Sequence, residues 1–420
     1  MTATAQTIAP GRDPVFRGNQ ARLSAAQLCS GIGIATGFAV GGILAEELTG
    51  RAQYAGFAQT ASILGAALLA IPLARLAREV SRRVALSVGF GIAVLGAALV
   101  LLGAATGLVV PFFLGMLAFG AATATGLQSR YAATDAAAPS ERARAMSVVV
   151  WASTVGSVAG PNLAGIGGKL GHLLGIGVYG GPFLISTLAF LGAVACVAGL
   201  RAPSHDITGA PRPTRGRPAD GLRAVVAHPG ALLGLATVVL GQTIMVSVMV
   251  MTPVHLHGHG TGIQLIGIVI SLHILGMYGL SPVMGILADR VGPRRVIWLG
   301  FALFAIALGV GLVDGLGTSN DARVMVALVL LGLGWSACFI AGSTLLSSSV
   351  PEAQRVPVQG LSDACMNVGA AVFAAVAGPL LAVGGFALIN TVAFGILGLG
   401  ILVAIVTARR ARQLPDLRLT

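Results

Sequence analysis

The feature that most constrains this chain is a series of twelve apolar runs, each close to the ~20 residues that a helix needs to cross a lipid bilayer. Backbone N–H and C=O groups within lipid must be hydrogen-bonded inside the protein, so runs of this length predict helices. The sequence therefore predicts an all-α polytopic membrane protein with twelve transmembrane helices in two pseudo-symmetric six-helix bundles. The runs lie near residues 23–45, 54–74, 84–105, 108–132, 146–170, 181–200, 229–253, 262–284, 296–314, 322–346, 359–383 and 386–407.

The composition excludes several other classes of protein. Hydrophobic residues make up 55% of the chain and charged residues only 10%, too few to cover the surface of a soluble domain. The net charge of +12 is scattered in short clusters between apolar runs, which argues against a nucleic-acid-binding face. Apart from three alternating histidines described below, we find no metal-ligand set, nucleotide-binding loop or nucleophile constellation in the sequence, and therefore expect no cofactor and no enzymatic activity.

Basic residues predict the orientation in the membrane. If both termini are cytoplasmic, 23 of the 26 Lys and Arg residues fall in cytoplasmic segments, and only Arg51, Lys169 and Arg323 lie outside. Positive residues favour the cytoplasmic side of a membrane, so this asymmetry predicts cytoplasmic termini in the plasma membrane.

The polar gap in the middle of the chain divides it into two halves. Its Pro-, Gly- and Arg-rich sequence predicts a flexible linker. The predicted parts are a tail (1–22), an N-terminal half (23–200), the linker (201–228), a C-terminal half (229–407) and a second tail (408–420). A repeat supports the division, because LARLAREVSRRV follows the second run where GILADRVGPRRV follows the eighth.

GILADRVGPRRV resembles the loop signature of the major facilitator superfamily, a large group of secondary transporters. The resemblance implies related halves that expose a central site to each membrane face in turn. It also implies a gating role for the loop, with Asp289 as its only carboxylate; the alternative is that Asp289 merely pairs with Arg290 or Arg294. The N-terminal copy has Ala77 in the equivalent place. The residues assigned to this gating motif are Gly285, Asp289, Arg290, Gly292, Arg294 and Arg295.

The fifth run contains GSVAGPNLAG at residues 156–165, which resembles a pattern found in superfamily members that export by antiport. Its assigned residues are Gly156, Gly160, Pro161 and Gly165. Glycines four residues apart also allow helices to pack closely, which is the alternative interpretation. The fourth run lacks the mid-span arginine of many proton-driven exporters, although Arg130 lies near one of its ends.

Polar residues inside the runs are candidates for function, because they are costly to place in a membrane. The resemblance implies that the first, fourth, seventh and tenth spans surround the substrate. The substrate candidates are Gln27, Gln128, Gln242, Trp335 and Asn367, and the proton-coupling candidates are Asp363, His273 and Arg130. An interhelical hydrogen bond is the alternative role for each polar residue.

Three alternating histidines, His255, His257 and His259, follow the seventh run. The pattern suits a metal ligand set or a pH sensor, and we interpret it first as an exposed outer loop.

Together these features predict a monomeric transporter in the lipid bilayer that exports a small, partly apolar molecule in exchange for protons. The alternatives are metabolite uptake by symport or facilitation and, from another class, a non-transporting membrane receptor or scaffold.

The predicted topology can be tested by labelling. A tag at the C-terminus and a single cysteine placed within 205–218 should both be shielded from a membrane-impermeant reagent in intact cells. Labelling of either site from outside would contradict the orientation.

Overall fold

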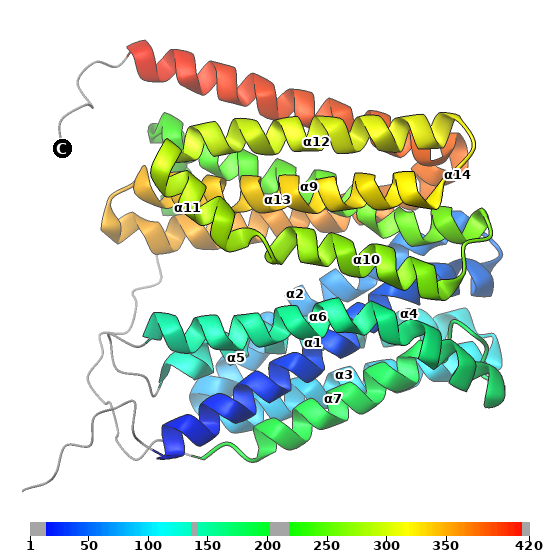
Figure 1. Cartoon of the computed structure of the whole chain (residues 1–420). Coiled ribbons are helices and arrows are strands. Elements are labelled where there is room, and N and C mark those ends of the chain that lie inside the picture. The colour runs from blue at the N-terminus through cyan, green and yellow to red at the C-terminus, as the bar shows by residue number, and fades with distance from the viewer. Residues whose placement is uncertain (1–13, 136–141, 202–217, 414–420) are drawn as a thin grey trace, which may run out of the picture. The chain divides into compact units, whose positions relative to one another are not determined.

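The computed structural model describes residues 14–135, 142–201 and 218–413, and these residues form helices and short connections without a β-strand (Figure 1). The elements are α1 (Pro14–Thr49), η2 (Ala52–Tyr54), α2 (Ala55–Glu79), α3 (Arg82–Thr106), α4 (Val109–Phe119), α5 (Ala121–Asp135), α6 (Arg142–Leu173), α7 (Pro182–Ala198), α8 (Pro218–Ala227), α9 (Pro229–Gly258), α10 (Ile263–Tyr278), α11 (Ser281–Val291), α12 (Pro293–Leu316), α13 (Asp321–Ser348) and α14 (Glu352–Gln413). The predicted tails and linker fall partly outside the described residues, at 1–13, 202–217 and 414–420.

The twelve predicted crossings are confirmed once three irregular helices are taken into account. α4 and α5 meet at Gly120 and form one crossing, and α10 and α11 meet at Gly279 and Leu280 and form another. α14 contains two crossings, because Gly384 and Gly385 leave helical geometry, with φ of +63° at Gly385. A positive φ is readily adopted only by glycine, so the chain can reverse there.

Nine stretches of the described residues are long and apolar enough to cross a membrane, and one of them, Val358–Arg410, holds both crossings of α14. α6 and the shorter apolar helix α7 supply the other two of the twelve crossings.

Contacts divide the chain into two compact units. The first unit comprises Met1–Leu44 and Ala61–Pro211, and the second comprises Ala45–Thr60 and Arg212–Thr420. The end of α1, η2 and the first turn of α2 therefore belong to the second unit, where the Thr60 hydroxyl of α2 lies 3.3 Å from the Ala371 carbonyl oxygen.

The first unit has an aromatic core that fits against glycines of α1. The ring of Phe119 packs edge-on against Phe190 and Phe183, with centroids 5.0 and 5.8 Å apart. A side chain on Gly33 would lie 2.5 Å from the Phe190 ring, and one on Gly37 would lie 2.6 Å from the Phe119 ring. These two positions therefore have to be small for the rings to remain buried.

The motif glycines of α6 bring its backbone against α1. A side-chain carbon on Gly156 would collide with the Leu28 carbonyl oxygen, and one on Gly31 would collide with that of Ser153. One turn along α6, the Thr36 hydroxyl donates to the Gly160 carbonyl oxygen at 2.8 Å. Close backbone approach of this kind supplies packing energy where lipid provides no hydrophobic driving force between helices.

In the second unit, glycines likewise allow the backbones of neighbouring helices to approach α13 closely. Gly234 of α9 faces Gly342, whose carbonyl oxygen would lie 2.6 Å from a side chain on Gly234. Gly276 of α10 faces α13 near Gly332, and a side chain on Gly332 would lie 2.5 Å from the His273 carbonyl oxygen. α13 is thus held between α9 and α10, two helices that carry candidate residues.

Two predicted irregular segments contain helix. α1 already includes Pro14, the first described residue, well before the apolar run at 23. The linker contains α8, whose Ala224 and Val225 are buried with Leu346, Val350 and Val358. The sequence analysis overlooked this short amphipathic segment, which is anchored by packing rather than by its own length.

The close approach of α1 and α6 predicts opposite effects for two glycine-to-alanine changes. Gly156→Ala should cost about 1–3 kcal/mol of stability, because the new methyl group meets backbone that cannot rotate away. Gly91→Ala in α3 meets open space and should be neutral or stabilising, since alanine favours helix. Thermal unfolding of the purified variants in one detergent measures the difference, and equal unfolding temperatures would contradict the packing.

Candidate substrate-binding and gating sites

A hydrogen-bonded aromatic cluster joins two of the predicted substrate residues in the second unit. The Trp335 indole Nε1 of α13 donates to the Gln242 side-chain oxygen of α9 at 2.6 Å. The Trp335 ring stacks on Phe339 at 4.8 Å with planes 8° apart, and Tyr278 of α10 meets it edge-on at 5.5 Å. We call Gln242, Tyr278, Trp335 and Phe339 the aromatic cluster. Trp335 is 6% exposed, so a ligand would meet this cluster through the more exposed rings of Tyr278 and Phe339, beside an amide, which suits a planar molecule with polar edges.

Sequence reasoning found Gln242 and Trp335 separately and missed Tyr278 and Phe339. Phe339 lies four residues after Trp335 and therefore on the same helix face, which was an available signal. Tyr278 carried no such signal, because it is brought in by a different helix.

The two predicted glutamines of the first unit are engaged within the protein. Gln27 of α1 is 3% exposed, and its Nε2 donates to the Gly126 carbonyl oxygen of α5 at 2.6 Å. The Gln128 side-chain oxygen accepts a hydrogen bond from Arg82 at 3.1 Å. Both residues join helices, the alternative role considered for them. Arg130 lies in α5, with its side chain outside the described part of the structure.

The remaining intramembrane candidates lie in two separate places. His273 of α10 is fully buried, and its Nδ1 lies 2.7 Å from the Leu328 carbonyl oxygen of α13. Asp363 and Asn367 are exposed on α14, where the Asn367 amide donates to the Asp363 carbonyl oxygen at 2.8 Å. His273 is therefore held in a helix contact, whereas the Asp363 carboxylate is on the surface of its unit.

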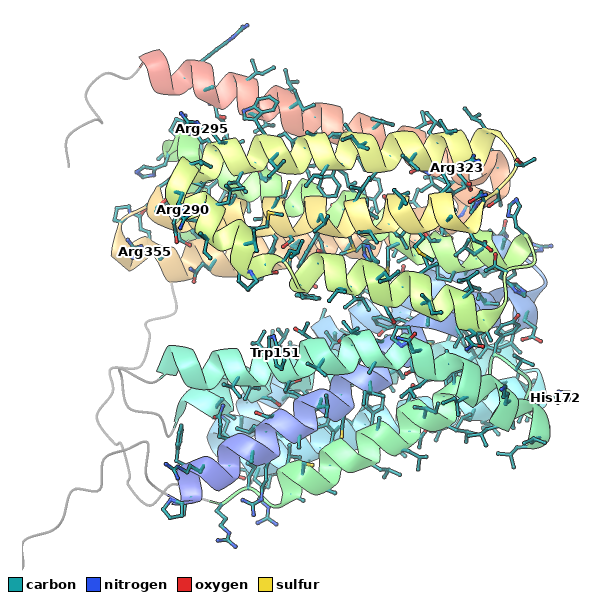
Figure 2. All side chains as sticks on the ribbon, viewed as in Figure 1. Trp151, His172, Arg290, Arg295, Arg323 and Arg355 are labelled. Atoms are coloured by element: carbon teal, nitrogen blue, oxygen red, sulfur yellow. The ribbon has the colours of Figure 1, made fainter. Side chains whose placement is uncertain are left out.

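The gating motif spans the end of α11 and the start of α12. Gly292 has φ of +90° and ψ of 145°, a conformation that favours glycine and ends α11 before Pro293 begins α12. Gly285 and Asp289 lie in α11, with Asp289, Arg290, Arg294 and Arg295 exposed around the turn. Figure 2 shows Arg290 and Arg295 at one end of the second unit and Arg323 at the opposite end.

The antiporter-like motif lies wholly in α6. Gly156 and Gly160 form the contact with α1, and Pro161 and Gly165 follow within the same helix. Pro161 removes one backbone hydrogen-bond donor from the interior of α6, which permits a bend there.

The interpretation of the three histidines as an exposed loop is wrong for His255. α9 continues to Gly258, and His255 is 7% exposed with its Nε2 3.0 Å from a carboxylate oxygen of Asp314. α9 thus continues one helical turn beyond the apolar run, because Asp314 of α12 is a hydrogen-bond partner for the buried imidazole of His255. No set of three or more His, Cys, Asp or Glu residues suited to a metal occurs in the described ranges. Sequence reasoning missed Asp314, which lies 59 residues away along the chain.

Comparisons with known proteins agree on one family. The model of the Major Facilitator Superfamily matches residues 23–265 and 233–418. The uncharacterized MFS-type transporter YdeG of Bacillus subtilis is 34% identical over 393 residues, which are 92% of this chain and 91% of that protein. The riboflavin transporter RfnT of Brucella anthropi is 29% identical over 371 residues, covering 86% of this chain and 88% of that protein.

Solved structures show the same fold. A mutant of the nucleoside transporter NupG superposes with a TM-score of 0.73 at 14% identity, over 93% of this chain and 99% of that one. An inward-facing bacterial homolog of the lysosomal transporter Spinster gives 0.67 at 15% identity, over 95% and 96%. With its twelve crossings and these relatives, the chain belongs to the major facilitator superfamily and is a multi-pass secondary transporter for a small molecule rather than an enzyme.

Proposed function

We propose that this transporter exports a small, partly apolar molecule with a planar aromatic ring, in exchange for protons. It acts as a monomer in the plasma membrane with both termini in the cytoplasm. The observation that carries the proposal is the aromatic cluster, in which Trp335 and Phe339 stack beside the Gln242 amide.

The cluster supports an aromatic substrate through its geometry and hydrogen bonding. Trp335 uses its only donor on Gln242, so the Gln242 NH₂ group remains the natural donor to a polar edge of a ligand. Tyr278 is 39% exposed and adds a second aromatic ring beside Trp335. The relative named as a riboflavin transporter supports the same class, since riboflavin has a planar heteroaromatic ring system.

Export is supported by the motif in α6. Gly156 and Gly160 bring α6 against α1 without intervening side chains, and Pro161 allows the helix to bend beyond that contact. Such a contact suits a helix pair that moves as one body while the rest of its unit adjusts. At the α11–α12 turn, we propose that Asp289 accepts backbone N–H groups from a helix start in one state and releases them in the other.

Proton exchange requires a group that water can reach from both sides in turn. Asp363 suits this role better than His273, because its carboxylate is exposed on α14 whereas His273 is buried and hydrogen-bonded to α13. A carboxylate that is alternately hydrated and buried binds protons differently in the two states.

The aromatic cluster predicts which substitutions weaken ligand binding. Trp335→Phe keeps the stack on Phe339 but leaves the Gln242 oxygen without its donor. Gln242→Leu leaves the Trp335 N–H unpaired. Each substitution should lower the affinity for riboflavin about tenfold. Thermal shift and fluorescence quenching with purified protein measure this, using lumichrome and a size-matched saturated compound in parallel.

Trp298→Phe is the matched control, because Trp298 lies exposed on α12 and outside the cluster. The control should bind as the wild type does. Stabilisation by the saturated compound alone, or an equal loss of affinity for riboflavin in all three variants, would contradict an aromatic substrate site.

The direction of transport and the role of Asp363 can be tested together in inverted membrane vesicles. Acidifying the vesicle interior should drive riboflavin inward, because an exporter in this orientation exchanges internal protons for external substrate. Asp363→Asn should abolish this accumulation while preserving exchange of labelled for unlabelled riboflavin, which needs no change of protonation. Accumulation that requires protons to enter with the substrate would instead indicate uptake by symport.

A further inference from the structure

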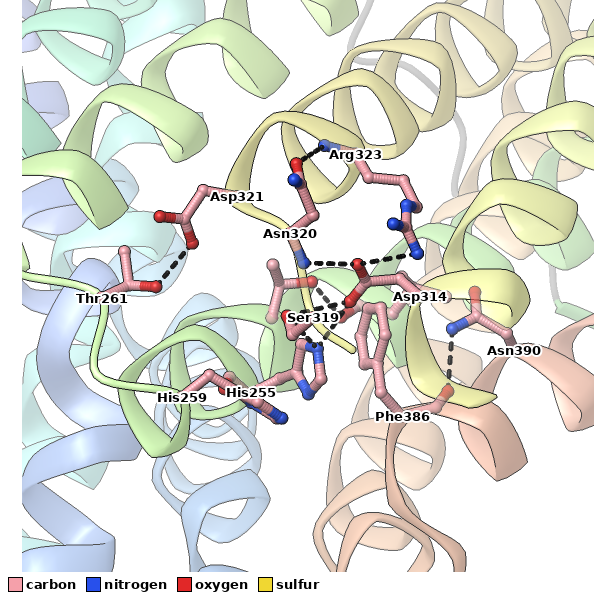
Figure 3. Close-up of polar contacts among 12 residues, drawn as sticks. His255, His259, Thr261, Asp314, Ser319, Asn320, Asp321, Arg323, Phe386 and Asn390 are labelled. Atoms are coloured by element: carbon pink, nitrogen blue, oxygen red, sulfur yellow. Dashed lines mark hydrogen bonds and ion pairs between the residues drawn. The ribbon is translucent and has the colours of Figure 1, made fainter. Parts of the chain in front are cut away.

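A buried histidine–carboxylate pair lies at the end of the second unit opposite the α11–α12 turn. Its members are His255 of α9 and Asp314 of α12, with the imidazole Nε2 3.0 Å from a carboxylate oxygen (Figure 3). The Asp314 side chain is fully buried, and that of His255 is 6% exposed. This end, which we call the His255 end, faces the cell exterior in the proposed orientation.

Asp314 is held as a carboxylate by several donors. One oxygen accepts the Asn320 backbone N–H at 2.8 Å and lies 3.8 Å from the Arg323 guanidinium. The other accepts the Ser319 hydroxyl at 3.0 Å as well as the His255 N–H. A buried charge needs such partners, and here they fix the connection between α12 and α13.

His255 links this carboxylate to a third part of the unit. Its ring stacks on Phe386 with centroids 4.4 Å apart and planes 10° apart. Phe386 directly follows the Gly384–Gly385 break at which α14 reverses. A side chain on Gly315 would lie 2.9 Å from the Phe386 carbonyl carbon, so α12 and α14 are in backbone contact beside the pair. One imidazole thus joins the ends of α9, α12 and the second crossing of α14.

The charges around His255 determine what a proton would do there. With His255 neutral, the charge of Asp314 is balanced by Arg323, whose side chain is 33% exposed, and a proton on His255 gives the cluster a net positive charge. A proton on His259 as well would add to the cost, because its ring lies 4.4 Å from that of His255. The other titratable groups near this end are His257 on α9, Asp321, which accepts the Thr261 hydroxyl at 2.6 Å, and Glu46, which interacts electrostatically with His257.

We propose that His255 is a proton-binding site whose protonation from the exterior releases the contacts joining α9, α12 and α14 at the His255 end. The neutral ring donates to Asp314 and lies flat on Phe386, which is the closed arrangement. The imidazolium requires water around it, so an added proton favours an arrangement in which this end is open and hydrated. The site rests on the proposed function only for the direction from which protons arrive.

The first test compares the pH dependence of thermal unfolding of the purified full chain in wild type and His255→Gln. Glutamine retains an N–H donor for Asp314 but does not titrate. Neutral His255 stabilises the closed fold above the pH range in which histidine side chains take up a proton. This stability is lost as the pH falls through that range. Between pH 7.5 and 5.5 the unfolding temperature of the wild type should fall by about 2–4 °C more than that of His255→Gln. His172→Gln, at an exposed histidine of the first unit, should behave as the wild type does.

A second variant covers the case in which His255→Gln does not fold. Arg323→Gln removes the other positive charge beside Asp314, so the cluster accepts a proton without becoming net positive. The fall in unfolding temperature on acidification should therefore be smaller in this variant.

Hydrogen exchange of residues 250–258 at pH 5.5 should be faster in wild type than in His255→Gln, with equal rates at pH 7.5. The proposal would be overturned if the unfolding temperature of Arg323→Gln fell as much on acidification as that of the wild type. Equal rates of hydrogen exchange in wild type and His255→Gln at pH 5.5 would also overturn it. Neither measurement requires transport, so failure of the proposed function would be seen separately.

Discussion

The structure depends on satisfying backbone hydrogen bonds where no water is available. Lipid offers no partners, so the chain forms helices throughout its apolar runs and holds them together by close packing rather than by the hydrophobic effect. Glycines of α1, α6, α9 and α13 supply that packing, for instance where Gly156 meets the backbone of Leu28. In the described residues, several interruptions of the helices fall at glycines, such as Gly384–Gly385 in α14. The large glycine content thus serves both contact and interruption.

The aromatic cluster and the His255 end are joined by the helices that carry them. Gln242 and His255 lie on α9 about 20 Å apart along the helix, and Trp335 and Arg323 lie at a similar spacing on α13. Release of His255 would shift α9 relative to α13 at the Gln242–Trp335 hydrogen bond, with Pro253 as a position between the two sites where α9 can bend. On this account the proton and the substrate act on the same pair of helices.

The sequence predicted the number of crossings well, because each apolar run has the length that a bilayer requires. It could not predict which way a polar residue points, since a small rotation decides between a neighbour and a central site. Gln27 and Gln242 were equal candidates, yet Gln27 bonds the backbone of α5 and Gln242 bonds Trp335. His255 was misread because its partner, Asp314, comes from another helix. The break between α11 and α12 was predicted, since Gly292 and Pro293 determine its backbone locally, and its gating role remains a proposal.

The proposed exchange of substrate for protons is measured most directly by following the protons themselves. The protein can be reconstituted in liposomes that contain a pH-sensitive dye, without any imposed gradient. External addition of the planar aromatic compound that most stabilises the purified protein should make the lumen more alkaline as substrate enters and protons leave. Luminal acidification during substrate entry, or substrate entry without any pH change, would contradict the account.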